Sequence, residues 1–456
     1  RNDFTNHKST KRVITFYKQL HRHNRFIIYI AIISAVFLLS YWVVFLLPIA
    51  WFLSVAFTTI ALIDLLLLFR FKKGIVASRN LPKKFSNSDE NNISIQLTNN
   101  YPFTIHLTVI DELPFQFQKR DFNYSKILEK HADDIFTYTI TPFERGAYHF
   151  GNLNVYAATF LALFSRRFAF DANAMVAVYP SYIQMKKYEF LAISNKINAV
   201  GLKKIRRIGH TLEFEQIKNY VVGDDVRTIN WKATAKKGEL MLNQYQDEKS
   251  QPIYSIIDTG RVMKMPFNQL KLLDYAINAT LAFSNIALLK NDKAGMLTFS
   301  KKVNDMVLAS SKKTNLSIIN ETLYNIQTDF SDSDFGLLYG TIKRKINQRS
   351  LLILYTNFEH ISSLKRQLPY LLALAKKHLL ITVLFENTEL DSLVTENSED
   401  LQEIYHKTIA EKFSYDKRLI VKELEKRGVN AILTKPEQLS INVINKYLAF
   451  KSKGLI

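Results

Sequence analysis

The residues whose type could support catalysis or bind a metal are acidic and lie at two places in the chain. At the first, Asp224 and Asp225 are adjacent and follow Gly223, which allows a tight turn. Two carboxylates can act as an acid–base pair or as metal ligands, but the side chains of neighbouring residues tend to point apart. A carboxylate here can also cap the following helix, because it accepts hydrogen bonds from the first backbone N–H groups. We favour a helix cap with an ion pair and keep the acid–base or metal role as the alternative.

Asp258 is the second candidate, because it directly follows the apolar run 253–257. If that run is a strand of a parallel sheet, Asp258 lies at the carboxyl end of the strand, where such sheets bind ligands. Other patterns of catalysis are absent from the sequence: the ten histidines show no H-E-x-x-H spacing, and there is neither a G-x-x-x-x-G-K-[ST] loop nor a G-x-S-x-G elbow. The chain has no cysteine, which excludes disulfides, thiolate metal sites and a cysteine nucleophile and agrees with a reducing cytoplasm.

The elements that must position Asp258 follow from the pattern after residue 251. Short apolar runs alternate there with helical segments, of which 270–289 and 416–427 are the clearest. This alternation predicts a parallel sheet covered by helices on both faces, and therefore an α/β doubly wound domain over residues 251–456. The predicted strands are 253–257, 294–299, 351–355, 379–385 and 429–433.

Before this domain the pattern is different. Residues 78–181 contain short runs in which apolar and polar residues alternate, such as 93–98 and 136–140. Runs of period two separated by turns predict an all-β antiparallel sandwich. Residues 182–250 then connect the sandwich to the α/β domain.

The chain begins with a basic segment, residues 1–25, and an apolar stretch, residues 26–71. Asp64 is the one charged residue between Phe26 and Phe69. A bilayer span needs about 20 apolar residues, so we expect a transmembrane α-hairpin with spans 26–46 and 49–70 and a turn at Leu46-Leu47-Pro48. Asp64 could reach the membrane interface or pair with Arg70. The alternative is a buried helical hairpin of a soluble protein, which would normally show a polar face.

Lysine and arginine flank this stretch on both sides, while the turn carries none. The positive-inside rule then places both termini and the soluble domains in the cytoplasm, with the turn outside. The formal charge of +20 is explained by attraction to anionic membrane lipid, because no nucleic-acid recognition motif accompanies it. We therefore expect no nucleic-acid partner. The flanking basic residues are Lys8, Lys11, Arg12, Lys18, Arg22 and Arg25 before the stretch, and Arg70, Lys72, Lys73, Arg79, Lys83 and Lys84 after it.

The segment around Asp224 carries a longer pattern, which resembles the signature of the domain of unknown function 58 family. From the residue types we expect Trp231 to be a large buried anchor and Gly238 to end a helix. The segments 145–153 and 178–181 resemble two further motifs of that family, and the paired spans fit it, so the resemblance extends over most of the chain. The signature residues are Tyr220, Gly223, Asp224, Asp225, Arg227, Ile229, Asn230, Trp231 and Ala235.

The order of elements after residue 251 resembles a von Willebrand factor A-like domain, as the family resemblance implies. In such domains a divalent cation is held by Asp-x-Ser-x-Ser after the first strand, a Thr from a second loop and an Asp after a central strand. Asp258 matches this pattern, but Gly260 and Val262 replace the two hydroxyl residues, and Thr356-Asn357 stands where an Asp is expected. The resemblance thus implies a degenerate cation site at Asp258, Thr356 and Asn357.

We expect this site to hold no metal and the chain to need no cofactor, with a divalent cation as the alternative. In that alternative, Asp332 and Asp334 could supply replacement oxygens. We favour a solvated loop with a helix cap for this pair. Without a cation, Asp258 would accept hydrogen bonds from loop amides or pair with Arg261 or a lysine.

These features together predict a membrane-anchored, non-enzymatic scaffold or adaptor in the cytoplasmic membrane of a bacterium. The family resemblance implies a cytosolic protein partner, a MoxR-type AAA+ ATPase, in cell-envelope or stress-related assembly. The alternative is a metal-dependent hydrolase that uses the Gly223-Asp224-Asp225 region.

Overall fold

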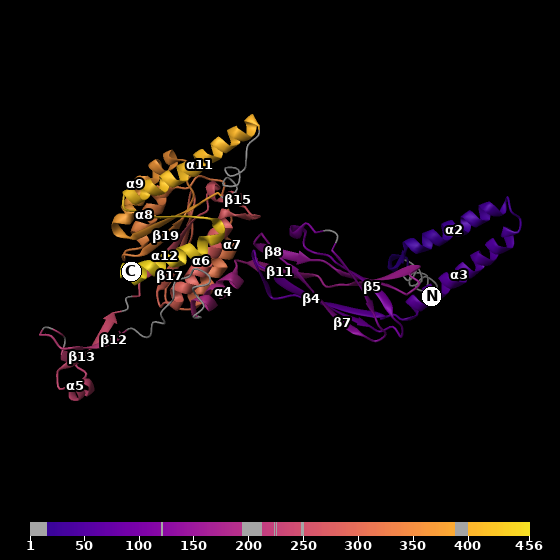
Figure 1. The fold of residues 1–456 in the computed structure, drawn as a ribbon, viewed down its shortest axis with the longest axis horizontal. Coiled ribbons are helices and arrows are strands. Elements are labelled where there is room, and N and C mark those ends of the chain that lie inside the picture. The colour runs from indigo at the N-terminus through magenta and orange to yellow at the C-terminus, as the bar shows by residue number, and fades with distance from the viewer. Residues whose placement is uncertain are drawn as a thin grey trace, which may run out of the picture. The chain divides into compact units, whose positions relative to one another are not determined.

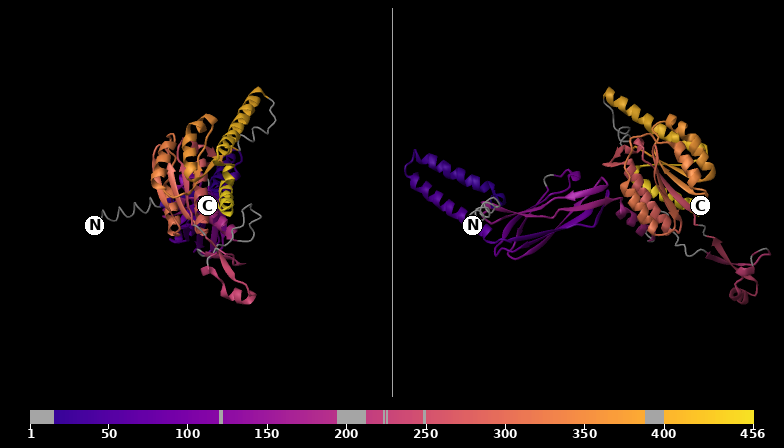
Figure 2. Two further views of the ribbon diagram at one scale, coloured as in Figure 1. Left: turned by 90° about the vertical axis from the view of Figure 1, so that its left-hand side faces the viewer. Right: turned by 180° about the vertical axis from the view of Figure 1, so that it is seen from behind.

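The computed structural model describes residues 16–119, 122–193, 212–222, 224, 226–247, 250–387 and 400–456. The chain divides into two compact units (Figures 1 and 2). One is built from Arg1–Ser86 and Glu90–Val178, and the other from Asn87–Asp89 and Tyr179–Ile456. The first unit is rich in β-strands and carries two apolar helices, whereas the second contains the α/β region.

The two apolar helices of the first unit are α2 (Asn24–Ser40) and α3 (Leu46–Arg70), which lie side by side in Figure 1. The chain turns between them at residues 41–45. The prediction of a turn at Leu46-Leu47-Pro48 was therefore wrong. Pro48 lies in the first turn of α3, where its missing N–H needs no helical partner.

By length and composition, α3 could cross a membrane, and only 11% of its most apolar window is buried within the chain. The shorter α2 is also apolar. Helix α6 (Leu272–Leu289) passes the same test as α3, but 83% of its window is buried, so α6 is the core helix of the α/β region. The exposed apolar surface of the described residues in α2 and α3 is what separates these two helices from α6.

Contacts at the carboxyl end of α3 fasten it to the strands of the same unit. Asp64 is fully buried and accepts hydrogen bonds from Thr159 Oγ1 and from the backbone N–H of Phe164, the latter at 3.1 Å. Arg166 Nη1 donates to the carbonyl oxygens of Leu68 and Phe71, at 2.9 and 2.7 Å. Asp64 thus pairs with the loop before Phe164 rather than with Arg70.

Three antiparallel sheets of the first unit pack around one apolar core. In β4, Ile93, Ile95 and Leu97 are buried while Asn92 and Gln96 are exposed, so the alternation seen in the sequence corresponds to an inner and an outer face. The sheets are β1 (Leu20–Arg22), β10 (Phe164–Phe170), β9 (Leu153–Ala158), β5 (Ile105–Asp111) and β6 (Asn123–Leu128); β3 (Lys84–Ser86), β11 (Ala174–Tyr179) and β8 (Gly146–Phe150); and β2 (Ile75–Asn80), β4 (Asn91–Asn99) and β7 (Asp133–Ile140).

The α/β region has a six-stranded sheet in which five strands are parallel and β18 is antiparallel. Numbered along the chain, the strand order is 3-2-1-4-5-6, the order of a doubly wound sheet. The α/β class predicted from the apolar runs is confirmed. In spatial order the strands are β18 (Val303–Ser310), β17 (Lys293–Phe299), β14 (Pro252–Asp258), β19 (Leu351–Tyr355), β20 (Leu379–Phe385) and β21 (Asn430–Thr434).

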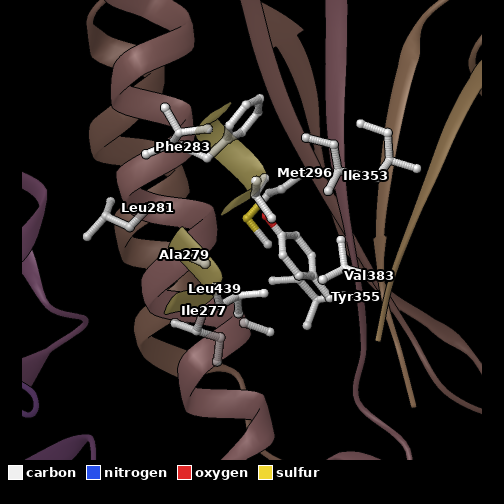
Figure 3. Packing of buried hydrophobic residues seen from close by; sticks show 14 of the residues in the cluster. Ile277, Ala279, Leu281, Phe283, Met296, Ile353, Tyr355, Val383 and Leu439 are labelled. Atoms are coloured by element: carbon white, nitrogen blue, oxygen red, sulfur yellow. The ribbon is translucent and has the colours of Figure 1, made fainter. Parts of the chain in front are cut away.

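Helices cover both faces of this sheet, and each face has its own apolar core. One core contains α6, α7 (Thr314–Asn325) and α12 (Leu439–Ser452), with α4 (Tyr182–Ile193) against α6. Figure 3 shows Phe283 of α6 facing Met296 and Ile353 of the sheet. The opposite core contains α8 (Phe335–Lys345), α9 (Ile361–Lys377) and α11 (Leu401–Lys426).

The family-signature residues form a separate small substructure. Strands β12 (Leu212–Asn219) and β13 (Met241–Asp247) pair antiparallel, and between them lie the 3-10 turn η3 (Val226–Thr228) and the short helix α5 (Trp231–Lys237). Gly238 ends α5 as predicted, with a φ of 77° and its N–H donating to the carbonyl of Thr234.

Candidate functional site

Asp258 lies at the carboxyl end of β14, next to the carboxyl end of β19. These are strands 1 and 4 of the sheet, where the strand order reverses and where doubly wound domains bind ligands. The side chain is buried, with 1% of its residue surface exposed. The fold thus places a carboxyl group inside the protein at the expected position for a site.

Three groups donate hydrogen bonds to this carboxyl group. Oδ1 accepts from the backbone N–H of Gly260 at 2.9 Å and from Ser333 Oγ, and Oδ2 accepts from Thr356 Oγ1 at 2.7 Å. Burial raises the pKa of Asp258, and the hydrogen bonds from Ser333, Thr356 and Gly260 act in the opposite direction. The Asp258 carboxyl group is therefore a hydrogen-bond acceptor whose three donors carry no charge.

Two of the three residues in the predicted cation site are brought together, because Thr356 contacts Asp258 directly. The third, Asn357, has its side-chain oxygen hydrogen-bonded to Lys417 Nζ instead. Ser333 comes from the loop before α8 and was not predicted as a partner of Asp258. It lies 75 residues away along the chain, and no spacing in the sequence marks such a contact.

The acidic residues beside Ser333 have other partners. Asp334 accepts from the backbone N–H of Leu337 at 2.9 Å and caps α8, as we favoured. Asp332 pairs with Arg261 at 2.9 Å, with both side chains largely exposed. Neither contact directs a carboxylate toward Asp258.

The groups around Asp258 are arranged for hydrogen bonds in this structure. Hard divalent cations take six or more oxygen ligands, including water molecules, and the two hydroxyl groups here donate their protons to the carboxylate that a cation would need. In the part of the chain that the structure describes, no group of three or more histidine, aspartate or glutamate residues is placed to hold a metal. Asp258, Ser333 and Thr356 would have to exchange their mutual hydrogen bonds for metal bonds.

A cavity of about 280 Å³ lies beside this site, against α11. Its walls are largely apolar, with Phe385 and Phe413 among them, and its polar lining includes Asn357, Glu359 and Lys417. Lys417 Nζ donates to Asn357 Oδ1 and to the carbonyl of Phe358, at 2.7 Å for the latter. Burial lowers the pKa of Lys417 to about 8, and Glu359 offsets part of this effect.

Sequence reasoning missed Lys417, because it is one of many charged residues on the 26-residue helix α11. Nothing in its local sequence distinguishes it from exposed lysines such as Lys422. One signal in the sequence could have pointed to Lys417: its helix follows the predicted strand 379–385, which is succeeded by the polar residues Glu386 and Asn387.

We expect Lys417 to react with acetic anhydride at pH 8 about tenfold faster than Lys422. At that pH the Lys417 amine is uncharged in about half of the molecules, whereas the amine of an ordinary lysine is almost fully protonated. Modification would be followed by peptide mass spectrometry on the full chain. Lys422 lies on the same helix and is exposed, which makes it the matched control. Equal rates at the two lysines between pH 7 and 9 would contradict the lowered pKa.

In the signature segment, Asp224 closes a turn rather than capping a helix. Its Oδ2 accepts from the backbone N–H of Val221 at 3.1 Å, and its Oδ1 from Lys218 Nζ at 3.2 Å. These two contacts lower the pKa of Asp224, with the Val221 amide contributing most. Gly223 and Asp225 lie outside the described residues.

Asn230 is the residue that caps α5. Its side-chain oxygen accepts from the backbone N–H of Ala233 at 3.0 Å, and its amide donates to Asn243 Oδ1 at 2.8 Å. The backbone N–H of Tyr220 donates to the carbonyl of Leu240, directly before β13, at 2.8 Å. Arg227 lies in η3 and is exposed. These signature residues therefore shape the hairpin and its helix.

The expectation that Trp231 is a buried anchor was wrong, since 70% of its surface is exposed. The reason is local: α5 has seven residues and packs on a pair of strands, which offers too little apolar surface to enclose an indole. Val221, Val222 and Val226 are exposed as well. We call these three residues and Trp231 the Trp231 group.

These elements lie in a part of the chain that matches a family model. Residues 216–394 match the family described as "Protein of unknown function DUF58". The DUF58 match includes Tyr220, Trp231, Asp258, Ser333 and Thr356. It begins after the segments 145–153 and 178–181, whose resemblance to further DUF58 motifs stays a prediction.

Comparison with curated proteins finds "Uncharacterized protein YeaD" from Bacillus subtilis (strain 168). It is 25% identical over 218 residues, which are 46% of this chain and 54% of YeaD. The aligned part therefore spans about half of that relative.

Two solved structures each resemble less than half of the chain. The conserved hypothetical protein BatB from Bacteroides thetaiotaomicron has 13% identity and a TM-score of 0.32, over 44% of this chain and 99% of BatB. The SpRpn10 VWA domain has 10% identity and a TM-score of 0.27, over 43% of this chain and 95% of that domain.

Proposed function

We propose that this chain is a membrane-anchored, non-enzymatic scaffold that binds a cytosolic protein partner. The observation that carries the proposal is the exposed apolar surface of α3, which is fastened through Asp64 and Arg166 to a folded β-rich region. Such a surface is unfavourable in water and is satisfied in a bilayer.

In this proposal α2 and α3 both span the cytoplasmic membrane of a bacterium. Helix α2 has 17 residues and is about 26 Å long, close to the hydrocarbon thickness. Tyr41, Trp42 and Phe45 are exposed in and beside the turn, where aromatic residues suit a membrane interface. The basic flanks then place both termini, and with them the α/β region, in the cytoplasm.

The α/β region would act as a von Willebrand factor A-like binding domain. Its strand order and the position of Asp258 support this assignment. Because Ser333, Thr356 and Gly260 already satisfy Asp258, we propose that partner binding needs no cation. The family resemblance suggests a MoxR-type AAA+ ATPase as the partner, in cell-envelope or stress-related assembly.

The Trp231 group is the proposed contact for this partner. Tryptophan is enriched at protein interfaces, where a few large apolar side chains carry most of the binding energy. Four exposed apolar side chains within residues 221–231 are costly in water unless a partner covers them. The metal-dependent hydrolase using Gly223-Asp224-Asp225 stays an alternative prediction, tested by activity and thermal melts of Asp224→Asn and Asp225→Asn.

We expect Trp231→Ser to reduce crosslinking of the ATPase in membranes by about tenfold or more, as for a central interface residue. Its melting temperature should change little, because Trp231 is exposed. Tyr405→Ser is the matched control, since Tyr405 is an exposed aromatic residue on α11. Undiminished capture by the Trp231 variant would refute this contact, and a periplasmic reporter at the C-terminus would refute the topology.

A further inference from the structure

A groove of about 560 Å³ lies in the β-rich unit, where α2 begins. Arg25, in the first turn of α2, and His23 just before it line one part of the groove. His106 and Lys126, from strands β5 and β6, line another part. The groove thus joins the start of an apolar helix to the surface of a sheet.

The charge of this groove is one-sided. Four of its lining residues are basic or histidine, and none of the lining residues is an aspartate or glutamate. Lys126 pairs with Asp134 at 2.5 Å, so its charge is partly balanced. Arg25 and His106 are exposed at the groove and can donate hydrogen bonds to an anion there.

Apolar residues form the other side of the groove. Phe160 and Ala162 line it, and they belong to the loop between β9 and β10. Phe160 is 74% exposed although it is a large aromatic residue. A ligand in this groove would therefore meet cationic groups at one place and an uncovered aromatic ring at another.

The same loop is held beside the apolar part of α3. Thr159 donates to Asp64, which lies six residues before Arg70 at the end of the helix. About 9 Å of helix therefore extends from Asp64 to Arg70. If α3 spans the membrane, this contact keeps Phe160 near the boundary between lipid chains and head groups.

We propose that this groove binds the phosphate of one anionic membrane lipid, with Arg25 and His106 at the phosphate and Phe160 against the start of an acyl chain. The inference rests on the proposed membrane anchoring and adds a specific lipid site to it. Phosphate chemistry alone would also suit a soluble phosphate ester. The continuity of the basic groove with an exposed aromatic ring and an apolar helix favours the lipid.

Native mass spectrometry of the delipidated full chain in detergent would test the proposal, with phosphatidylglycerol and the zwitterionic phosphatidylcholine as probes. We expect one retained phosphatidylglycerol and a preference for it over phosphatidylcholine. Arg25→Ala and His106→Ala should each reduce phosphatidylglycerol binding, by about fivefold for Arg25. Lys130→Ala removes an exposed positive charge in the same unit outside the groove lining and should leave binding unchanged.

Equal retention of the two lipids by the wild-type chain would overturn the proposal, as would an unchanged preference in both groove variants. Displacement of the lipid by glycerol 3-phosphate at equal concentration would show that a soluble phosphate ester is the ligand. Arg25 and His106 are exposed, so both variants should fold, which thermal melts would verify. Recovery of the chain in the membrane fraction is a separate readout: its failure would refute the anchoring, whereas retention without lipid preference would refute only the groove.

Discussion

Replacing Arg79 by Met is expected to lower the free energy of unfolding of the β-rich unit by about 3–5 kcal/mol. Arg79 and Asp111 form an ion pair whose side chains are 1% and 0% exposed. Asp111 also accepts from Tyr138 at 2.6 Å, and Arg79 donates to the carbonyl oxygen of Gly151 at 3.0 Å. The substitution would leave the Asp111 carboxylate buried without its cation.

Thermal and urea unfolding of the full chain in detergent would measure this effect. The double variant Arg79→Met with Asp111→Leu removes both charges, so it should be more stable than the single variant. Lys126→Met is a control, because the Lys126 side chain is 43% exposed in its ion pair with Asp134, whereas that of Arg79 is 1% exposed. If Arg79→Met melted like the Lys126 variant, the buried pair would not be important for stability.

Asp258→Asn is expected to remove a pH dependence of stability in the absence of divalent cations. Because burial raises the pKa of Asp258, the folded chain retains a proton at pH values where the unfolded chain has lost it. The unfolded carboxyl ionises near pH 3.9, so stability is greatest below that value and falls as pH rises toward the higher folded pKa. The wild-type melting temperature should therefore fall across this window more steeply than that of the Asn variant.

The change in unfolding free energy across this pH window should be larger in the wild type than in Asp258→Asn by more than about 0.5 kcal/mol, which is the usual effect of a surface substitution. Asp332→Asn alters an exposed carboxylate of the neighbouring loop and should leave the pH profile unchanged. Mg²⁺ provides the opposite test. If it raised the melting temperature of the wild type but not of Asp258→Asn, a cation would bind here, and our description of Asp258 as a hydrogen-bonded carboxyl group would fail.

The strands and core helices could be predicted because their signals are local. The apolar run 253–257 corresponds to β14, and the alternation of 93–98 corresponds to the two faces of β4. The helix predicted at 416–427 was part of the longer α11, because the polar residues before it face outward from the same helix. Period and composition are sufficient to indicate such elements.

The contacts that build the site could not be predicted, since they join residues far apart in the sequence. Ser333 reaches Asp258, and Thr159 reaches Asp64 across 95 residues. The prediction that Trp231 is buried failed for another reason. Burial depends on how much apolar surface surrounds a residue, and the short α5 supplies little. A residue type indicates a tendency to be buried, whereas the tertiary surroundings decide the outcome.

The attachment of Asp64 to the β9–β10 loop has a mechanical consequence. A helix pair joined only through the chain end of α3 could tilt or rotate without moving the strands. Here two contacts hold α3, one at Asp64 and one at Leu68, where Arg166 binds the backbone. Because these contacts lie at different positions along the helix axis, α3 resists tilting relative to the strands. If α3 spans a membrane, as proposed, a tilt imposed on it by bilayer thickness would be passed to the strands of the same unit, and the β-rich unit would then respond mechanically to the membrane.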